Sequence, residues 1–136
     1  MDEQNVSVLV VDDQAPFRDA ARAVLERTRG FSLVGEAVSG EQAEVLVEEL
    51  APSLVVMDIN MGAIDGIEAT RRITARHPGL MVVLCSTYPV DDLPPGVRTS
   101  GAAAYVHKEE LSGRILRRLW ERGGDPGFRS SAISGS

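Results

Sequence analysis

Three carboxylates stand directly after two short apolar segments of the chain. Asp12 and Asp13 follow Val8–Val11, and Asp58 follows Leu54–Met57. Apolar segments this short are typical of buried strands in a parallel sheet, and the carboxyl ends of such strands border the ligand crevice where the strand order reverses. Like charges gathered there repel one another unless a cation or phosphate chemistry requires them. The sequence therefore predicts an acidic pocket that binds magnesium.

Strand-like and amphipathic segments alternate along the chain and would position these carboxylates. The strands are predicted at Val6–Val11, Phe31–Ala37, Leu54–Met57, Met81–Cys85 and Ala103–Val106. Helices are predicted from about Pro16 to about Thr28, after the capping-box spacing Ser39–Gln42, from Gly66 to about Arg76, and along Leu111, Ile115 and Leu119. This alternation predicts an α/β fold, a doubly wound five-stranded parallel sheet of the (βα)5 type with right-handed crossovers.

The stretch between the fourth and fifth predicted strands departs from the pattern. Tyr88–Gly96 contains three prolines, which remove backbone donors and clash with the preceding helical turn, so we expect a shortened or irregular fourth helix. Residues 123–136 are rich in Gly and Ser and almost free of apolar side chains, which predicts a disordered tail. The predicted domain therefore spans residues 5–122.

The composition argues against several classes of protein. A net charge of −6 disfavours a nucleic-acid-binding surface, which needs clustered Lys and Arg. No signal peptide is visible, and no apolar run reaches the roughly 20 residues of a membrane helix. Cys85 is the only cysteine. It lies in an apolar run and is expected to be a buried thiol, which agrees with a cytoplasmic location.

An ordered set of motifs resembles the receiver domain of bacterial two-component response regulators over residues 5–122. The acidic pair closes Val10–Asp13, and Val56–Met61 resembles the phospho-acceptor strand of that family. Asp65–Ile73 is similar to the helix that follows. Ser86 and Lys108 stand after the fourth and fifth predicted strands at intervals that suit the family, and Tyr105 falls at its switch aromatic. The resemblance implies a flavodoxin-like fold with strand order 2-1-3-4-5.

The resemblance also assigns roles to these residues. Asp58 would be the nucleophile that forms an acyl phosphate. Mg²⁺ or Mn²⁺ would be held by Asp13 directly, by Asp12 through water, by Asp58 and by the backbone oxygen of Asn60. Lys108 and Ser86 would contact phosphoryl oxygens. The contact with Ser86 would then leave room for Tyr105 to rotate inward, so that Ser86 and Tyr105 form the switch.

Three departures from the family pattern put signal transmission, rather than phosphorylation, in doubt. Gly62 stands where the family usually has Pro, which makes the loop after Asp58 more flexible. Glu109 replaces the Pro that often follows the lysine, which removes the usual reason for a cis peptide bond. The helix breakers Pro94–Gly96 lie on the expected output face.

The leading hypothesis is a signalling switch that is phosphorylated by a histidine kinase and is not a turnover enzyme. A magnesium phosphohydrolase would need a second Asp where Asn60 stands, and a nucleotide or flavin binder would need a Gly-rich phosphate loop that the sequence lacks. A pseudo-receiver that binds partners without phosphorylation remains an alternative. The output is either a downstream protein or a DNA-binding domain absent from this chain, and a homodimer is possible. No direct nucleic-acid or membrane contact is expected.

Overall fold

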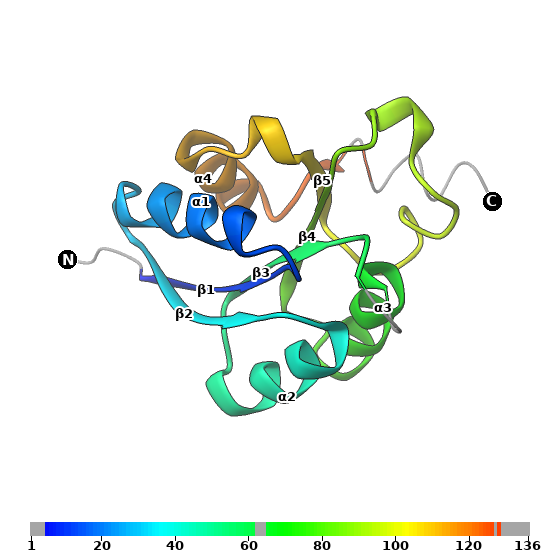
Figure 1. Ribbon diagram of the computed structural model, residues 1–136, viewed down its shortest axis with the longest axis horizontal. Helices are drawn as coiled ribbons and strands as arrows, with labels where there is room; N and C mark the ends of the chain where they lie inside the picture. The colour runs from blue at the N-terminus through cyan, green and yellow to red at the C-terminus, as the bar shows by residue number, and fades with distance from the viewer. Residues whose placement is uncertain (1–4, 62–64, 127, 129–136) are drawn as a thin grey trace.

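Five parallel strands form one sheet in the order β2-β1-β3-β4-β5 (Figure 1). This computed structural model describes residues 5–61, 65–126 and 128. The strands are β1 (Val6–Val11), β2 (Phe31–Ala37), β3 (Leu54–Asp58), β4 (Met81–Ser86) and β5 (Ala104–His107). The predicted fold class and strand order are confirmed, and each strand lies within one residue of its predicted bounds at either end.

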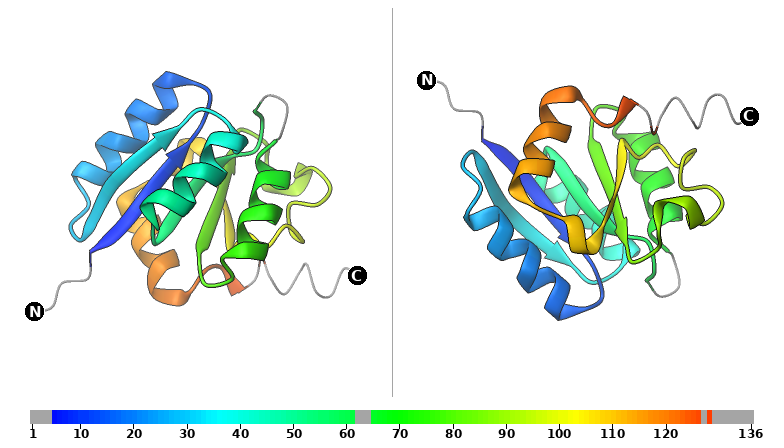
Figure 2. Two further views of the ribbon diagram at one scale, coloured as in Figure 1. Left: turned by 90° about the horizontal axis from the view of Figure 1, so that it is seen from below. Right: turned by 90° about the horizontal axis from the view of Figure 1, so that it is seen from above.

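Helices cover both faces of the sheet (Figure 2). The helices are α1 (Ala15–Glu26), α2 (Gly40–Leu50), α3 (Gly66–Arg76) and α4 (Gly113–Arg122). α1 and α4 pack on one face, and α2 and α3 on the other (Figure 1). Strand order and right-handed crossovers explain why α1 lies on the face opposite α2 and α3, because the chain moves one way along the sheet from β1 to β2 and the opposite way from β2 to β4. Within the described residues, no helix is long and apolar enough to cross a bilayer.

Alternating side chains of the strands build two apolar cores. Leu9 and Met57 point into the core beneath α2 and α3, whereas Val8 and Val56 point into the core beneath α1 and α4. All four side chains are fully buried. A central strand that is apolar on both faces cannot shift its register by one residue without exchanging these sets, so the two cores fix the positions at which the strands end.

Side-chain caps set the starts of three helices. Ser39, Asp65 and Ser112 each accept a hydrogen bond from the backbone N–H three residues later, at the first turns of α2, α3 and α4. Two helix predictions need correction. α1 ends at Glu26 rather than Thr28, whose hydroxyl instead donates to the carbonyl of Val24. Leu111 precedes α4, because the cap at Ser112 places the start of that helix after it.

The expected irregularity between β4 and β5 is confirmed. The only helical element there among the described residues is a single 3₁₀ turn, Val90–Asp92, which Pro89 precedes. Pro94 and Pro95 follow within three residues and prevent the turn from continuing as an α-helix. The element labelled α4 is therefore the one that follows β5.

Gly66 allows α3 to start against the end of β3. A Cβ atom at this position would lie 1.9 Å from the backbone oxygen of Asp58 and 3.0 Å from the Cα of Ile59. Backbone atoms cannot move aside as a flexible side chain can, so Gly66→Ala should lower the free energy of unfolding by about 1–3 kcal/mol. Urea unfolding measures the loss. Gly79→Ala is the matched control, because nothing lies within 4 Å of a Cβ there; equal effects in the two variants would contradict this explanation.

Candidate functional site

The predicted site residues meet at the carboxyl ends of the strands. Asp12 follows β1, Asp58 ends β3, Ser86 ends β4 and Lys108 follows β5. The strand order reverses at β1, since β2 lies on one side of it and β3 on the other. The site therefore occupies the position at which open α/β sheets bind ligands.

Asp12 is completely buried and held at each of its polar atoms. Its N–H donates to the carbonyl of Ala37 at 3.0 Å, and its Oδ1 accepts from the N–H of Gln14 at 2.8 Å. Its Oδ2 lies 2.7 Å from the Nζ of Lys108. Asp13, by contrast, is exposed and has one weak contact, from the Gln14 side-chain amide at 3.4 Å. The carboxylate of Asp12 is thus buried and held in one position, whereas the carboxylate of Asp13 is accessible to solvent.

An arginine on α1 holds the backbone of the acidic pair. The Nη1 of Arg18 donates to the carbonyl of Asp12 at 2.8 Å, and its Nε donates to Glu36 of β2 at 3.1 Å. Glu36 also pairs with Arg22 at 2.6 Å. The sequence reasoning missed this contact. An arginine and a glutamate that are distant in sequence leave no local pattern by which they could be paired.

Lys108 is the cation of the site. Besides Asp12, its Nζ lies 3.3 Å from the Oδ1 of Asp58. The ammonium group also lies 4.7 Å from the centroid of the Phe17 ring, a favourable cation–π arrangement. Phe17 lies on α1 and packs against the core beneath α1 and α4. Its second role is to cover Lys108, which is mostly buried.

The charge balance of the pocket shifts several pKa values. Burial, and then repulsion from Asp12, raises the pKa of Asp58 to about 6, although Lys108 and a backbone hydrogen bond at Asn60 act in the opposite direction. Burial alone would lower the pKa of Lys108, but its hydrogen bond with Asp12 and the charge of Asp58 outweigh that effect and raise it. One lysine therefore only partly compensates the carboxylates.

The three carboxylates could hold a metal ion. One oxygen from each of Asp12, Asp13 and Asp58 lies within 4.8 Å of the others. This is the only such group of His, Cys, Asp or Glu side chains within the part of the chain that the structure describes. An all-oxygen set with one exposed member fits a hard divalent cation that keeps several water ligands, as Mg²⁺ does. The backbone oxygen of Asn60 as a further ligand stays a prediction.

A hydroxyl network joins the predicted switch residues. The Oγ of Ser86 accepts from the N–H of Tyr88 at 3.1 Å and shares a hydrogen bond of 2.8 Å with the hydroxyl of Tyr105. The Tyr105 hydroxyl also donates to the carbonyl of Tyr88 at 2.7 Å. The structure thus shows Tyr105 in an inward position, tied to the first residues of the β4–β5 connection. Its predicted rotation stays a prediction.

Three further features of the sequence near the site are Glu109, Cys85 and Gly62. Glu109 belongs to a 3₁₀ turn, Lys108–Glu110, and its N–H donates to Nδ1 of His107 at 3.1 Å, which a proline at this position could not do. Cys85 is completely buried, and this burial raises the pKa of its thiol to about 12. Gly62 lies outside the described residues.

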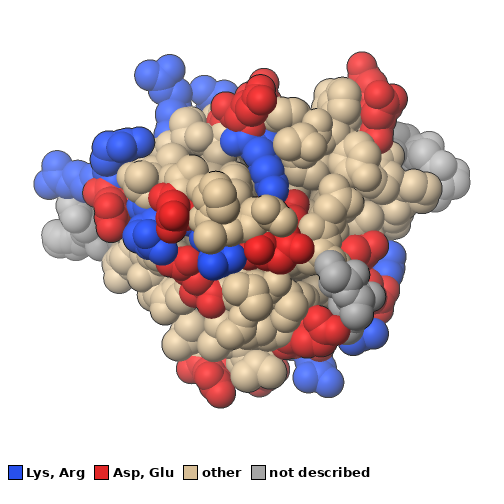
Figure 3. Space-filling model, viewed as in Figure 1, with Lys and Arg blue, Asp and Glu red and all other residues tan. Residues whose placement is uncertain are grey.

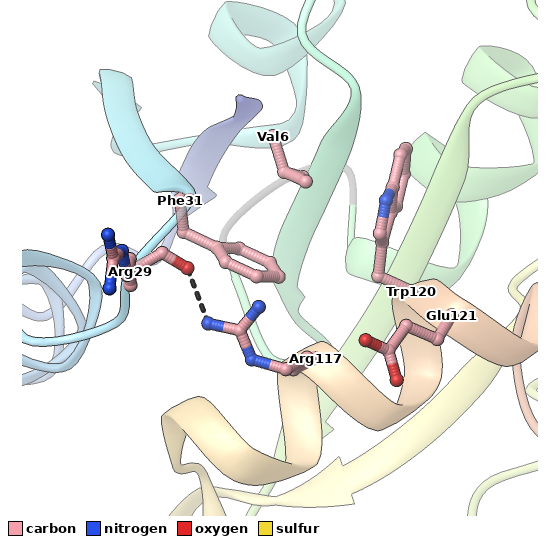
Figure 4. Close-up of a pocket in the computed structure, with 7 residues that line it drawn as sticks. Val6, Arg29, Phe31, Arg117, Trp120 and Glu121 are labelled. Carbon is pink, nitrogen blue, oxygen red and sulfur yellow. Dashed lines mark hydrogen bonds between the residues drawn. The ribbon is translucent and has the colours of Figure 1, made fainter. Parts of the chain in front are cut away.

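A hollow of about 250 Å³ lies at the opposite end of the sheet from the acidic pocket. Val6 and Phe31, at the starts of β1 and β2, line it together with Arg117 and Trp120 of α4 (Figure 4). Arg117 lies over the Phe31 ring and donates to the carbonyl of Arg29. Basic side chains gather on the side of the molecule where α1 and α4 lie, interspersed with acidic ones (Figure 3). These features are separate from the strand ends where the carboxylates meet.

Comparisons with known proteins identify the family of this chain. Residues 8–119 match the model of the response regulator receiver domain family. The chain is 38% identical over 103 residues to the response regulator GacA of Pseudomonas protegens, covering 76% of this chain and 48% of that protein. It is 32% identical over 109 residues to the transcriptional regulatory protein DegU of Brevibacillus brevis, covering 80% of this chain and 46% of that protein. The chain spans about half the length of these curated relatives.

Solved structures show the same fold. A two-component response regulator of the LuxR family from Aurantimonas superposes with a TM-score of 0.79 at 25% identity, covering 97% of this chain and 98% of that one. The receiver domain of the putative response regulator NarL from Mycobacterium tuberculosis superposes with a TM-score of 0.74 at 23% identity, covering 88% and 96%. At the identity of the latter, the likeness concerns the fold alone.

Proposed function

The chain belongs to the response regulator receiver domain family, and on that premise we propose that Asp58 accepts a phosphoryl group from a histidine kinase in a reaction that requires Mg²⁺. One observation carries the proposal. The carboxylate of Asp58 lies 3.3 Å from the ammonium group of Lys108 and within 4.8 Å of two further carboxylates, in a pocket at the strand ends. This is the arrangement that a carboxylate nucleophile needs to approach a charged phosphoryl group.

The residues divide the work of phosphoryl transfer. A carboxylate oxygen of Asp58 forms the new bond to phosphorus while the bond from phosphorus to the donor nitrogen breaks, and the donor imidazole leaves with that electron pair. Mg²⁺ held by Asp13, Asp12 and Asp58 would offset the negative charge of the phosphoryl group. Lys108 pairs with Asp58 before the transfer and with a phosphoryl oxygen after it. Arg18 keeps the acidic pair in place through the carbonyl of Asp12.

Ser86 supplies the signal in this proposal. Ser86 is only 1% exposed, and it lies at the end of β4, beside the strand that ends in Asp58. Donation to a phosphoryl oxygen would take the Ser86 proton from the Tyr105 hydroxyl, which itself donates to the carbonyl of Tyr88. Two packings of the β4–β5 connection would then differ in energy according to the state of Asp58.

The partners follow from the same premise. We propose a histidine kinase as the donor, a cytoplasmic location, and an output that passes to another protein or to a DNA-binding domain of a longer chain. The relative from Brevibacillus brevis is a transcriptional regulatory protein, which favours the second form of output. The chain would act as a switch with slow self-hydrolysis rather than as a turnover enzyme. Asn60 supports this, because a phosphohydrolase with an Asp nucleophile would need an acidic group there.

Intact mass spectrometry tests the proposal. The native chain is incubated with acetyl phosphate, with Mg²⁺ or with excess EDTA, and the modified residue is located by peptide mapping. We expect one added phosphoryl group, on Asp58, only when Mg²⁺ is present. If no label accumulates, beryllium fluoride tests for fast hydrolysis, because it mimics a stable phosphoryl group. A folded protein that neither takes the label nor binds the mimic would instead be a partner-binding pseudo-receiver.

A further inference from the structure

Among the described residues, the β4–β5 connection provides no α-helix to cover its part of the α2–α3 face of the sheet, and Phe128 packs into the core of this face. A right-handed connection from β4 to β5 lies on the same face as α2 and α3, but the 3₁₀ turn in this connection buries none of its residues. Phe128 is only 5% exposed and packs in the core formed with α2 and α3, where Val97 and Ala102 are also buried. The segment after α4 thus supplies apolar contact that a fourth helix would otherwise supply.

Backbone hydrogen bonds direct this segment past the start of β5. α4 is followed by Gly123, whose φ of 73° is left-handed, and the N–H of Gly124 donates to the carbonyl of Leu119 at 2.8 Å. This is the pattern by which glycine reverses the chain after a helix. The N–H of Asp125 then donates to the carbonyl of Ala103 at 2.9 Å. Figure 2 shows the segment leaving α4 beside β5, towards α3.

Arg98 holds Phe128 from the β4–β5 connection. Its guanidinium lies 5.1 Å from the centroid of the Phe128 ring, and its Nη1 donates to the Phe128 carbonyl at 3.4 Å. A cation over an aromatic face that is this well buried is attractive beyond its apolar contact. The neighbouring Val97 is 1% exposed and Ser100 is 2% exposed, so this part of the connection is fixed although it is not helical.

We propose that Val97, Arg98 and Ala102 form a docking surface for the chain's own segment after α4, with Phe128 as the anchor, and that phosphorylation of Asp58 weakens this docking. The second half of the proposal rests on the proposed function. The surface belongs to the connection that starts at Tyr88, and Tyr88 is held by Ser86 and Tyr105. When the Ser86 hydroxyl donates to a phosphoryl oxygen, it no longer donates to the Tyr105 hydroxyl, which in turn donates to the carbonyl of Tyr88. Tyr88 and the connection that follows are then less firmly held in the conformation that docks Phe128.

This coupling gives the switch a direct route to whatever follows the receiver. The segment after α4 would be bound to the receiver in the unphosphorylated state and released in the phosphorylated state. Linkage requires the converse as well: release of Phe128 by mutation must favour the phosphorylated state by the same free energy. The effect can therefore be measured from either end.

Hydrogen exchange at the amide of Asp125 tests the docking without any phosphoryl group. Phe128→Ala in the full chain should speed this exchange at least about tenfold. The free energy lost when a buried aromatic ring is removed is larger than the difference that corresponds to a tenfold change in local opening. Arg98→Gln should act in the same direction. Val90→Ala is the matched control, since Val90 lies on the same connection and is 56% exposed. Amides of β1 report whether each variant keeps its fold. Unchanged exchange in a folded Phe128→Ala protein would overturn the docking.

Beryllium fluoride with Mg²⁺ tests the coupling. In the native chain it should speed exchange at Asp125 several-fold, and it should add nothing in Phe128→Ala, where the segment is already released. Phe128→Ala should also bind the mimic several-fold more tightly. If the mimic raises the melting temperature but Asp125 exchange is unchanged or slowed, the coupling is wrong while the proposed function stands. If the mimic does not bind, the proposed function and the coupling both fail, and the docking is judged from the mimic-free comparison.

Discussion

Asp58→Asn is expected to abolish phosphoryl incorporation and, in metal-free protein, to make the fold more stable. The amide has no nucleophilic carboxylate oxygen, so no acyl phosphate can form. The same change removes a charge from a buried group that repels Asp12. After allowance for partial solvent screening, the free energy of unfolding at pH 7.5 should rise by about 1–2 kcal/mol. Intact mass with acetyl phosphate measures the loss, and urea unfolding in EDTA measures the gain.

The stability gain should depend on pH in a defined direction. In the folded protein the pKa of Asp58 is raised to about 6 from its ordinary value of 3.8, so the folded state binds this proton more tightly than the unfolded state. The native chain therefore gains stability as the pH falls through about 6 towards 3.8, and the variant has no such group. The advantage of Asp58→Asn should shrink between pH 7.5 and pH 4.5.

Asp19→Asn is the matched control for this variant. Asp19 is an exposed carboxylate of α1 whose side chain is 65% accessible, and its neutralisation should change stability by less than about 0.5 kcal/mol. Phosphorylation should be unaffected. A stability gain of Asp58→Asn that is constant across the pH range, or an equal gain from Asp19→Asn, would contradict the conclusion that the buried charge of Asp58 destabilises the fold.

The positions of the site residues could be predicted because parallel strands bring their carboxyl ends to one edge. Asp12, Asp58 and Lys108 each lie beside a short apolar run, and periodicity is enough to identify such runs. Contacts between distant side chains have no such signal. Nothing in the sequence pairs Arg18 with the carbonyl of Asp12.

The end of the chain shows the same limit more clearly. Residues 123–136 were predicted to be disordered from their composition, and the structure describes only residues 123–126 and 128 of them. Phe128 is buried against Arg98. A single aromatic residue among Gly and Ser forms no periodic pattern, so the sequence gives no sign that it is buried. Phe128 is buried because the proline-rich connection forms no helix at that place and leaves space for its ring. That space is a tertiary feature, which a local reading of either segment cannot detect.

Lys108→Met is expected to have the second large effect, because it leaves Asp12 and Asp58 without their cation. Both carboxylates are buried, and the Nζ of Lys108 lies 2.7 Å from one and 3.3 Å from the other. Loss of one partner of a buried ion pair leaves an uncompensated charge. Since Lys108 is itself partly exposed, we expect a loss of about 2–3 kcal/mol in the free energy of unfolding at pH 7.5 in EDTA.

The phosphoryl transfer itself should slow about 100-fold in Lys108→Met, the usual effect of removing one donor that faces developing negative charge. The loss of stability has a conditional rescue that a merely structural lysine would not show. Mg²⁺ supplies positive charge to the same carboxylates, so it should restore much of the lost stability but not the rate. Acidification below pH 7.5 should restore stability too, because without the lysine the pKa of Asp58 rises further above its value in the native protein. Lys108→Arg keeps the charge and should retain stability. A Lys108→Met protein whose stability responds to neither Mg²⁺ nor pH would show that the lysine acts through packing against Phe17 rather than through its charge.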